Sequence, residues 1–352
     1  MTHLIIHRCG PLTSIQDRGR YGWHRFGIPA SGAADPLALA AANMLVGNPP
    51  DTAGIELVMQ GLNIEVVGGP ARLALAGARM SLSLDGEFVG DHSAFLLQPG
   101  RRLEIGMART GVYALLAVDG GLQIPAALGS RSLHARSRIG GLGGKHLADG
   151  DHLPLVLGRP QSDATSAIDP LPITPFTALR TVLGPQDSYV TSDALTTFFS
   201  SDYAVTNEVD RMGCRLLGPP VSLAKGYNIV SDGIVGGSVQ IPGSGQPIVM
   251  LADRQTTGGY PKIATVITPD LRLLMQRRPG ELVRFRTVSV DEARTAAIAA
   301  AADLTRLRRS MRPARRAIER SETLLSLNLA GDALNALDPL TWPAARMPLA
   351  RR

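Results

Sequence analysis

Short apolar segments separated by glycine-rich turns occupy most of the first 290 residues. Segments typical of β-strands recur at roughly 8–12-residue spacing, first over 55–158 and again over 179–288. The chain also contains 38 glycines and 25 prolines, which supply turns and interrupt helices. This pattern excludes a helical bundle, whereas a barrel or a sandwich accommodates it. We therefore predict a mainly β fold with a few short helices.

Local signals set the bounds of the expected elements. Asp35-Pro36 supplies an N-cap and a first-turn proline for a helix that Gly47 ends. Asp85-Gly86 is a hairpin signal, and Ser289 with Glu292 forms a capping box for a helix over about 290–309. Further helices are expected at 192–199, 268–276 and 317–337. Strands are expected at 3–8, 55–59, 63–67, 72–76, 80–84, 103–105, 112–118, 152–157, 179–183, 203–206, 214–217, 234–241, 247–252 and 282–288.

Composition divides the chain into three parts. Residues 159–178 contain four prolines and little apolar pattern, which is typical of a linker. A length of 352 residues also favours two domains over one. We predict an N-terminal β subdomain over 1–160, a second β subdomain over 179–290, and an arginine-rich helical tail over 291–352.

The net charge of +6 does not indicate a nucleic-acid-binding protein. Residues 291–352 hold eleven arginines and seven acidic residues, so +4 of the +6 belongs to the tail. The body of the chain carries only +2, which is too little for an electrostatic footprint on nucleic acid. A solvated helix face is the favoured interpretation of the tail, and contact with an acidic partner or nucleic acid is the alternative.

Several standard chemistries are absent from the sequence. Two cysteines, Cys9 and Cys214, cannot build a disulfide framework or a paired-cysteine metal site. No pair of the seven histidines forms the H-E-x-x-H motif, and we expect no metal site. The phosphate-loop motif is missing. The N-terminus lacks a signal-peptide pattern, and no apolar run is long enough to cross a membrane. We expect a cytoplasmic protein.

The segment from Asp253 to Lys262 has the densest set of reactive side chains. It follows an apolar strand, and a loop at a strand end holds polar groups on a rigid base. Asp253 could accept a proton or orient Arg254, whose guanidinium suits a carboxylate or phosphate. Lys262 is one of only three lysines in the chain. The alternative is an internal Asp253–Arg254 salt bridge that only pins the loop. Candidate catalytic residues are Asp253, Arg254, Tyr260 and Lys262.

Substrate-binding candidates come from this loop and from three other polar segments. In the loop, threonine hydroxyls and glycine amides are suited to an oxyanion. In the other segments, Asp17 with Arg18 and Asp210 with Arg211 are favoured as structural pairs, because an adjacent acid and base satisfy each other at a turn. The candidate substrate-binding residues are Gln16, Asp17, Arg211, Gln240, Gln255, Thr256, Thr257, Gly258 and Gly259.

These polar segments carry a resemblance to a known family. The matching runs are Gly10-Pro11, Gln16–Arg20, Ser31–Pro36, Ala42–Asn48, Gly129–Ser132, Asp210–Gly213 and Asp253–Val266. In this order they resemble the biotin-dependent carboxyltransferase family, which includes the C component of 5-oxoprolinase, the KipA-like proteins and the carboxyltransferase region of urea carboxylase. The resemblance covers about residues 5–295. It implies two cyclophilin-like β-barrel subdomains.

The resemblance also implies an activity and partners. Bacterial members work with a KipI-like partner, the B component, and in 5-oxoprolinase a LamB/YcsF-like A component joins them for ATP-dependent opening of 5-oxoproline to glutamate. Biotin is normally attached to a lysine between methionines, and none of the three lysines here has a methionine neighbour. A biotin-dependent urea or amide carboxyltransferase would therefore need biotin on another chain. A non-catalytic regulator that binds a KipI-like inhibitor is the third hypothesis.

Overall fold

The computed structural model describes residues 2–156, 166–173 and 177–313. These residues form one compact unit with a mainly β fold. The N-terminal subdomain is built on a nine-stranded sheet with the path β2-β3-β8-β4-β1-β9, and β5 pairs with β8 beside that path. Its strands are β1 His3–Cys9, β2 Ser14–Gln16, β3 Gly54–Val58, β4 Leu62–Val67, β5 Ala71–Leu84, β6 Glu87–Val89, β7 Ala94–Leu97, β8 Arg102–Val118 and β9 His152–Pro154.

The C-terminal subdomain is a closed barrel of seven strands in the order β11-β18-β15-β16-β13-β12-β19. Two strand pairs lie outside it, β10 with β20 and β14 with β17. The barrel strands are β11 Thr177–Leu183, β12 Asp202–Val209, β13 Gly213–Leu217, β15 Ser238–Gln240, β16 Ile248–Met250, β18 Lys262–Val266 and β19 Leu282–Thr287. The outlying strands are β10 Ser166–Ala167, β14 Asp232–Gly233, β17 Thr257–Gly258 and β20 Arg312–Pro313.

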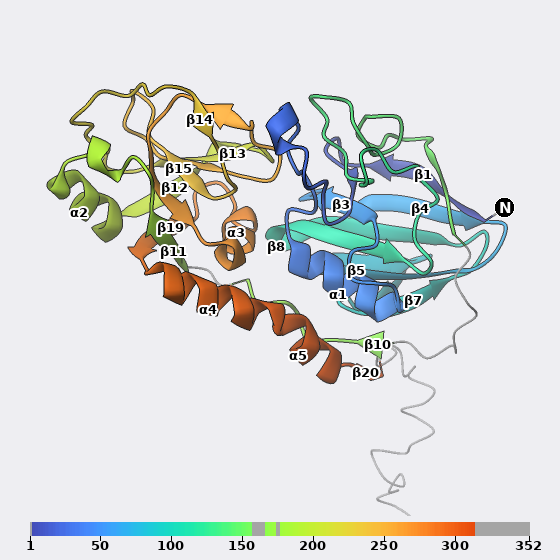
Figure 1. Cartoon of the computed structure of the whole chain (residues 1–352). Coiled ribbons are helices and arrows are strands. Elements are labelled where there is room, and N and C mark those ends of the chain that lie inside the picture. Colours follow the sequence, from blue (N-terminus) through green and yellow to red (C-terminus); the bar gives the residue numbers. More distant parts are fainter. Residues whose placement is uncertain (1, 157–165, 174–176, 314–352) are drawn as a thin grey trace, which may run out of the picture. The chain divides into compact units, whose positions relative to one another are not determined.

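Helices are short and lie around the strands (Figure 1). Five α-helices and two 3-10 turns are found in the described residues. They are η1 His24–Phe26, α1 Pro36–Val46, η2 Asp187–Tyr189, α2 Ser192–Ser200, α3 Thr268–Met275, α4 Val290–Ala301 and α5 Asp303–Arg309. None of these helices is long and apolar enough to cross a membrane.

The mainly β prediction is confirmed, but only the second subdomain closes into a barrel. In the first, the end strands β2 and β9 do not pair with each other, so its sheet stays open. Two pairs of predicted strands also merge: 72–76 with 80–84 into β5, and 103–105 with 112–118 into β8. The residues between them are bulges, with register shifts on β5 after Gly77, whose φ is 108°. A bulge bends a strand without ending its pairing.

Local turn and cap signals are confirmed. Asp35 caps α1 by accepting from the Ala38 amide at 3.1 Å, and Gly47 ends it at φ 83°. Asp85 and Gly86 form the two-residue turn between β5 and β6, both with positive φ. The capping box of Ser289 is present, although the helix predicted over 290–309 is divided into α4 and α5 at Ala302. Strand β18 was not predicted. The helix expected at 317–337 and part of the 159–178 linker lie outside the described residues.

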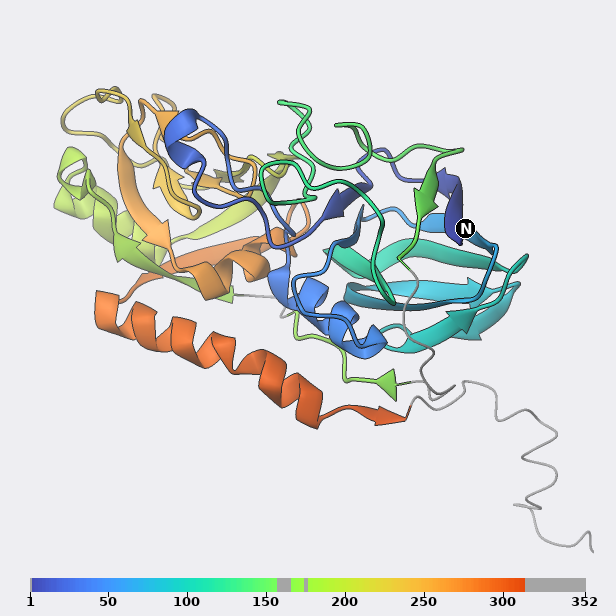
Figure 2. The ribbon, with the colours of Figure 1, turned by 45° about the vertical axis from the view of Figure 1, so that its right-hand side comes forward.

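Side chains from β8 and α1 join the two subdomains. Val112 and Tyr113 of β8 belong to the same apolar cluster as the barrel interior. Asp35 accepts from the guanidinium of Arg272 in α3 at 2.9 and 3.0 Å. Gln276, just after α3, donates to the Tyr113 carbonyl at 2.8 Å and to Asp35 at 3.0 Å. These buried contacts fix the barrel against the sheet. Figures 1 and 2 both show α5 beside α1, in agreement with the apolar cluster that the two helices share.

Candidate functional site

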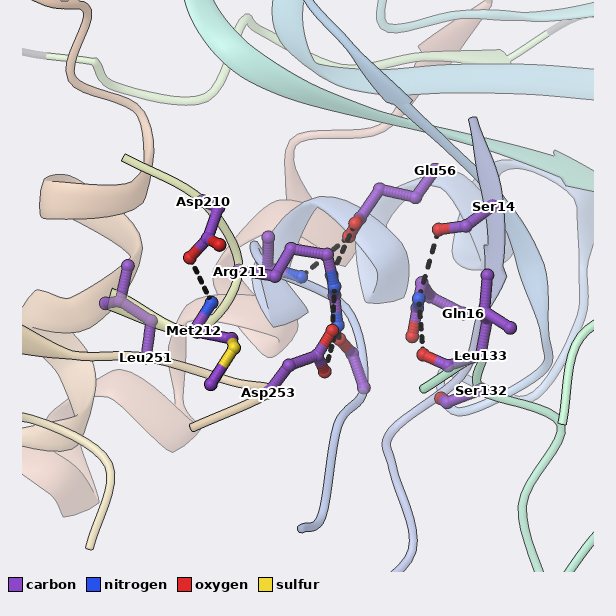
Figure 3. Close-up of polar contacts among 12 residues, drawn as sticks. Ser14, Gln16, Glu56, Ser132, Leu133, Asp210, Arg211, Met212, Leu251 and Asp253 are labelled. Carbon is purple, nitrogen blue, oxygen red and sulfur yellow. Dashed lines mark hydrogen bonds and ion pairs between the residues drawn. The ribbon is translucent and has the colours of Figure 1, made fainter. Parts of the chain in front are cut away.

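Arg211 is the centre of a buried polar cluster at the junction of the two subdomains (Figure 3). It lies in the turn between β12 and β13. Its Nε and Nη2 donate to Asp253 at 2.8 and 3.1 Å, and Nη2 also donates to the Gly32 carbonyl at 2.6 Å. Its Nη1 donates to Glu56 of β3. One guanidinium therefore binds a carboxylate from each subdomain.

Burial and charge oppose each other in this cluster. Glu56 is fully buried, and burial raises its pKa in spite of the neighbouring Arg211 and the Ala34 amide that donates to it at 2.7 Å. Burial disfavours the charge on Arg211, but Glu56 and Asp253 outweigh burial and raise the pKa of Arg211. Arg211 therefore stays cationic between its two partners. The cluster is rigid because each of its charges is hydrogen-bonded.

The predicted pairs of adjacent acids and bases do not form. Asp210 accepts from the Met212 and Gly213 amides at 2.7 and 3.0 Å, while Arg211 reaches across the junction. Asp253 binds Arg211, and Arg254 donates instead to the carbonyls of Ile234 and Leu251, both at 3.2 Å. The Asp253–Arg254 bridge expected as an alternative is therefore wrong.

The predicted Asp17–Arg18 pair is wrong for a similar reason. The Asp17 carboxylate accepts from Gly19 N at 2.8 Å, Ser130 Oγ and Arg131 N at 2.6 Å each, and Ser132 Oγ. Burial raises the pKa of Asp17, but these hydrogen bonds more than offset it and the pKa is lowered. Arg18 faces Asp51 at 3.5 Å. Asp17 thus holds the 130–132 segment against β2, and its oxygens are occupied by the protein.

A cavity of about 330 Å³ opens beside the Arg211 cluster. Residues of both subdomains line it. Its polar wall includes Gln16, His134, Arg136, His146, Arg211 and Asp253, and its apolar wall includes Val58, Val112 and Met275. This volume falls at the lower end of the range of about 300–1,000 Å³ for small-molecule sites. Three residues predicted from the sequence, Gln16, Arg211 and Asp253, therefore meet in one cavity.

Arg254 faces a different cavity, although it follows Asp253 in the chain. This second cavity measures about 480 Å³ and is lined by Arg254, Tyr21, Ser31 and Thr268, among others. Burial lowers the pKa of Arg254, partly offset by Tyr21 and Asp253. The described residues provide no carboxylate partner for Arg254, whose hydrogen bonds go to main-chain carbonyls. A partly buried guanidinium of this kind is suited to an anionic ligand.

Lys262 belongs to a third group on the barrel. Its side chain is 3% exposed and its Nζ binds Asp232 at 2.8 Å, while its main chain pairs with Gln240 on β15. The Thr257-Gly258 strand β17 pairs with Asp232-Gly233 of β14, which fixes the loop over this group. A Cβ at Gly258 would lie 2.6 Å from the Ile234 side chain and 3.0 Å from the Gln240 side chain, so a larger residue there would displace the Ile234 side chain.

The predicted 253–262 site is therefore divided among three places. None of residues 255–262 lines either of the two cavities described here. Gln255 and Thr257 are exposed, and Tyr260 is 39% exposed. The carbonyls of Thr256 and Gly259 accept from Ile234 and Ile229 at 2.9 and 2.8 Å. The roles predicted for Gln255, Thr256, Gly259 and Tyr260 stay predictions.

Glu56 and His134 were not among the predicted residues. Glu56 lies in an apolar strand between Ile55 and Leu57, and an acid within such a strand signals a buried partner. His134 lies in an irregular glycine-rich segment, where no periodicity marks it. The imidazole of His134 contacts the main chain of Asp253. Among the described residues, no cluster of three or more histidine, cysteine or acidic side chains is placed to hold a metal.

Comparison with known proteins identifies the family. The model for the carboxyltransferase domain, subdomain A and B, matches residues 26–287. The chain belongs to this family. It is 36% identical over 282 residues to the C component of 5-oxoprolinase from Haemophilus influenzae, covering 80% of this chain and 89% of the relative. It is 35% identical over 290 residues to the C component of 5-oxoprolinase from Escherichia coli, covering 82% and 93%. The resemblance predicted from the motifs is confirmed.

A solved structure supports the fold. The urea carboxylase of Kluyveromyces lactis superposes with a TM-score of 0.79 at 24% identity, covering 91% of this chain. The chain spans 30% of that larger protein. At this identity the likeness concerns the fold alone. In this carboxyltransferase fold, the junction between the two subdomains carries the first cavity.

Proposed function

We propose that this chain is the C component of an ATP-dependent 5-oxoprolinase complex, which converts 5-oxoproline to glutamate. The observation that supports this most is the 35–36% identity to the C components of two 5-oxoprolinases over nearly their whole length. Membership of a complex implies partners, and we propose a KipI-like B component and a LamB/YcsF-like A component. The small cavity at the subdomain junction supports a small-molecule substrate.

The proposed reaction requires activation of a poor electrophile. In the lactam, transfer of the terminal phosphoryl group of ATP to the carbonyl oxygen releases ADP. One water then attacks the ring carbon and the C–N bond breaks, with the nitrogen leaving as the amine, to give an acyl phosphate. A second water hydrolyses the acyl phosphate to glutamate and phosphate. The protein's contribution is to position these groups and to stabilise negative charge on the transferred phosphoryl group. The ATP site is proposed to be shared with a partner protein, and no biotin is attached to this chain.

The geometry ranks the candidate residues for binding anionic groups and for positioning the reacting groups. Arg254 faces the second cavity with no carboxylate partner among the described residues, so we assign an anionic phosphate group to it first. Lys262 already binds Asp232, and it acts in this scheme only if that exposed carboxylate exchanges with the ligand. Asp253 holds Arg211, and we assign it to positioning rather than to proton transfer.

The test is glutamate release by the assembled complex. The chain is co-purified with the KipI-like and LamB/YcsF-like products of neighbouring genes, and glutamate is measured with ATP and 5-oxoproline. Activity that requires ATP and disappears when this chain is omitted supports the proposal. A folded complex without activity contradicts it.

The carboxyltransferase component of a biotin-dependent urea or amide carboxylase is the second candidate. The fold shared with the K. lactis urea carboxylase favours it. That function needs a biotin carboxylase and a biotinylated lysine on other chains. Bicarbonate- and biotin-dependent carboxylation of urea by a reconstituted mixture would distinguish the two functions. A KipA-like regulator would show neither activity but would bind a KipI-like protein.

A further inference from the structure

Three buried side-chain atoms without a hydrogen-bond partner converge on the first cavity. They are Oε1 of Gln16, Nδ1 of His134 and Nδ1 of His146. Buried polar atoms are normally paired, because leaving one unpaired costs free energy. Three such atoms in the wall of one cavity therefore point to a polar ligand that pairs with them.

The orientation of the Gln16 amide is fixed by its protein contacts. Its Nε2 donates to the Leu133 carbonyl at 3.2 Å and to Ser14 Oγ at 3.0 Å (Figure 3). A carbonyl only accepts hydrogen bonds, so the nitrogen must face Leu133 and the oxygen must face the cavity. The side chain is fully buried. Gln16 thus presents a fixed acceptor, and its ligand must donate.

His134 presents a second acceptor to the same cavity. The contact of the His134 ring with the Asp253 main chain raises the pKa of His134, which is the effect of a hydrogen bond that the ring donates. Nδ1 is the ring nitrogen that has no hydrogen-bond partner. Nε2 is then the donor, and Nδ1 carries a lone pair in the neutral ring. Burial outweighs the contact and lowers the pKa of His134, so the ring is neutral at pH 7.

The charges around the cavity favour a neutral group at its inner end and an anion at its rim. Of the charged residues that line it, Asp253 is bound by Arg211, Asp210 accepts from two main-chain amides, and Arg277 is paired with Glu281 at 3.8 Å. Arg136 is exposed at the rim, and the described residues show no hydrogen bond or ion pair to it. A guanidinium in that place is suited to a carboxylate.

We propose that this cavity binds a small amide with an unsubstituted N–H, which donates to Gln16 Oε1, with a ligand carboxylate at Arg136. The ring N–H of 5-oxoproline fits this description, and in that detail the inference rests on the proposed function. A lactam has a single N–H group. This group donates to Gln16 because the position of the Gln16 acceptor is fixed. His134 Nδ1 then accepts from the water next to the lactam carbonyl, and His146 Nδ1 donates to that carbonyl.

The N–H is tested by replacing it with oxygen in a ligand of the same shape. Binding of 5-oxoproline and of its γ-lactone counterpart, 5-oxotetrahydrofuran-2-carboxylate, to the full chain is measured by calorimetry at pH 8. We expect the lactam to bind at least about tenfold more tightly, because the lactone leaves the Gln16 oxygen unpaired. Equal affinity of the two ligands, or no binding of the lactam to the chain or its complex, would overturn the proposal.

Variants assign the preference to Gln16. Gln16→Met removes the acceptor at similar volume and is expected to abolish the preference for lactam over lactone. Gln123→Met is the matched control, because Gln123 is exposed and lies outside the cavity. The comparison of two ligands on the wild-type chain keeps the proposal testable if Gln16→Met folds poorly. An unchanged lactam preference in a folded Gln16→Met variant contradicts the proposed site.

The outcomes separate this site from the proposed function. If the complex hydrolyses 5-oxoproline with the same KM in wild type and Gln16→Met, the result supports the proposed function and contradicts the proposed binding site. If the chain binds the lactam preferentially but the complex shows no turnover, the result supports the proposed binding site and contradicts the proposed function. Urea is a third probe, and urea binding that depends on Gln16 supports the amide class while favouring the carboxyltransferase alternative.

Discussion

Arg211 of the β12–β13 turn and Glu56 of β3 form a buried ion pair that joins the barrel to the N-terminal sheet. The two residues are 155 positions apart in the chain. Asp253 binds the other edge of the same guanidinium, so the pair also fixes the start of the 253–262 loop. The cavity between the subdomains therefore has a rigid charged wall. Because Arg211 already binds the carboxylates of this wall, the hydrogen-bond acceptors that remain free belong to neutral side chains.

Removing the shared cation should destabilise the fold strongly. In Arg211→Met, Glu56 and Asp253 remain buried without their partner. We expect a loss of about 3–5 kcal/mol in the free energy of unfolding, measured by urea denaturation. Arg215→Met is the control, because Arg215 and Glu208 form an exposed pair whose loss costs less than about 1 kcal/mol. Similar losses in the two variants would contradict the role of Arg211.

Acid should weaken the protein partly through Asp17. Its pKa lies below the ordinary value of 3.8, so its contribution to stability is present above that value and is lost as pH falls through the folded-state pKa. Asp17→Asn should lower the unfolding free energy at pH 7 by about 1–3 kcal/mol and flatten its decline below about pH 4. Denaturation curves from pH 2.5 to 7 measure this. Asp51→Asn, at an exposed carboxylate, should keep the wild-type decline.

Loss of the Arg254 charge should impair turnover rather than folding. Its guanidinium contacts only main-chain carbonyls among the described residues, and we assign it to an anionic ligand group. In the assembled complex, Arg254→Met should lower kcat/KM by about 10²–10³. Arg101→Met, at an exposed residue just before β8 that pairs with Asp85, should leave activity unchanged. Activity within about twofold of wild type in Arg254→Met would remove this residue from the site.

Lys262→Met gives a separate test of the barrel group. Its partner Asp232 is half exposed, so water solvates the carboxylate that the substitution leaves behind. We therefore expect little loss of folding but a strong fall in turnover, by about 10²-fold or more. Thermal unfolding and glutamate release are measured on the same sample. Wild-type turnover would assign Lys262 to the barrel structure alone.

Binding of the lactam should weaken in acid through His134. Protonation converts Nδ1 from an acceptor to a donor, and the pKa of His134 lies below its ordinary value of 6.5. Asp253, Arg20 and Arg211 are the charged groups that act on this ring. We expect affinity to be constant from pH 7 to 8 and to fall below about pH 6. In His134→Asn this fall should disappear, and a persisting decline would assign it to another group.

The sequence determined the local structure and the family. Caps, turn residues and apolar spacing act within a few residues, so the bounds of α1, the Asp85-Gly86 hairpin and the mainly β class follow from the chain itself. The motif runs from Gln16 to Val266 also identified the family that the comparisons confirm. Gln16, Arg211 and Asp253 were recognised as candidates because they lie in segments dense in polar groups, which cost free energy to bury unless they have a partner or a function.

Only the tertiary structure decided which partner each polar group has. Neighbouring residues such as Asp253 and Arg254 line different cavities, because the chain turns at residues 252–253, where the Arg254 amide donates to the Leu251 carbonyl at 3.3 Å. Glu56 and His134 reach the site through long-range packing that no local pattern encodes. Hydrogen bonds between residues more than a hundred positions apart depend on how the sheet and barrel are packed, and that packing is a property of the whole chain.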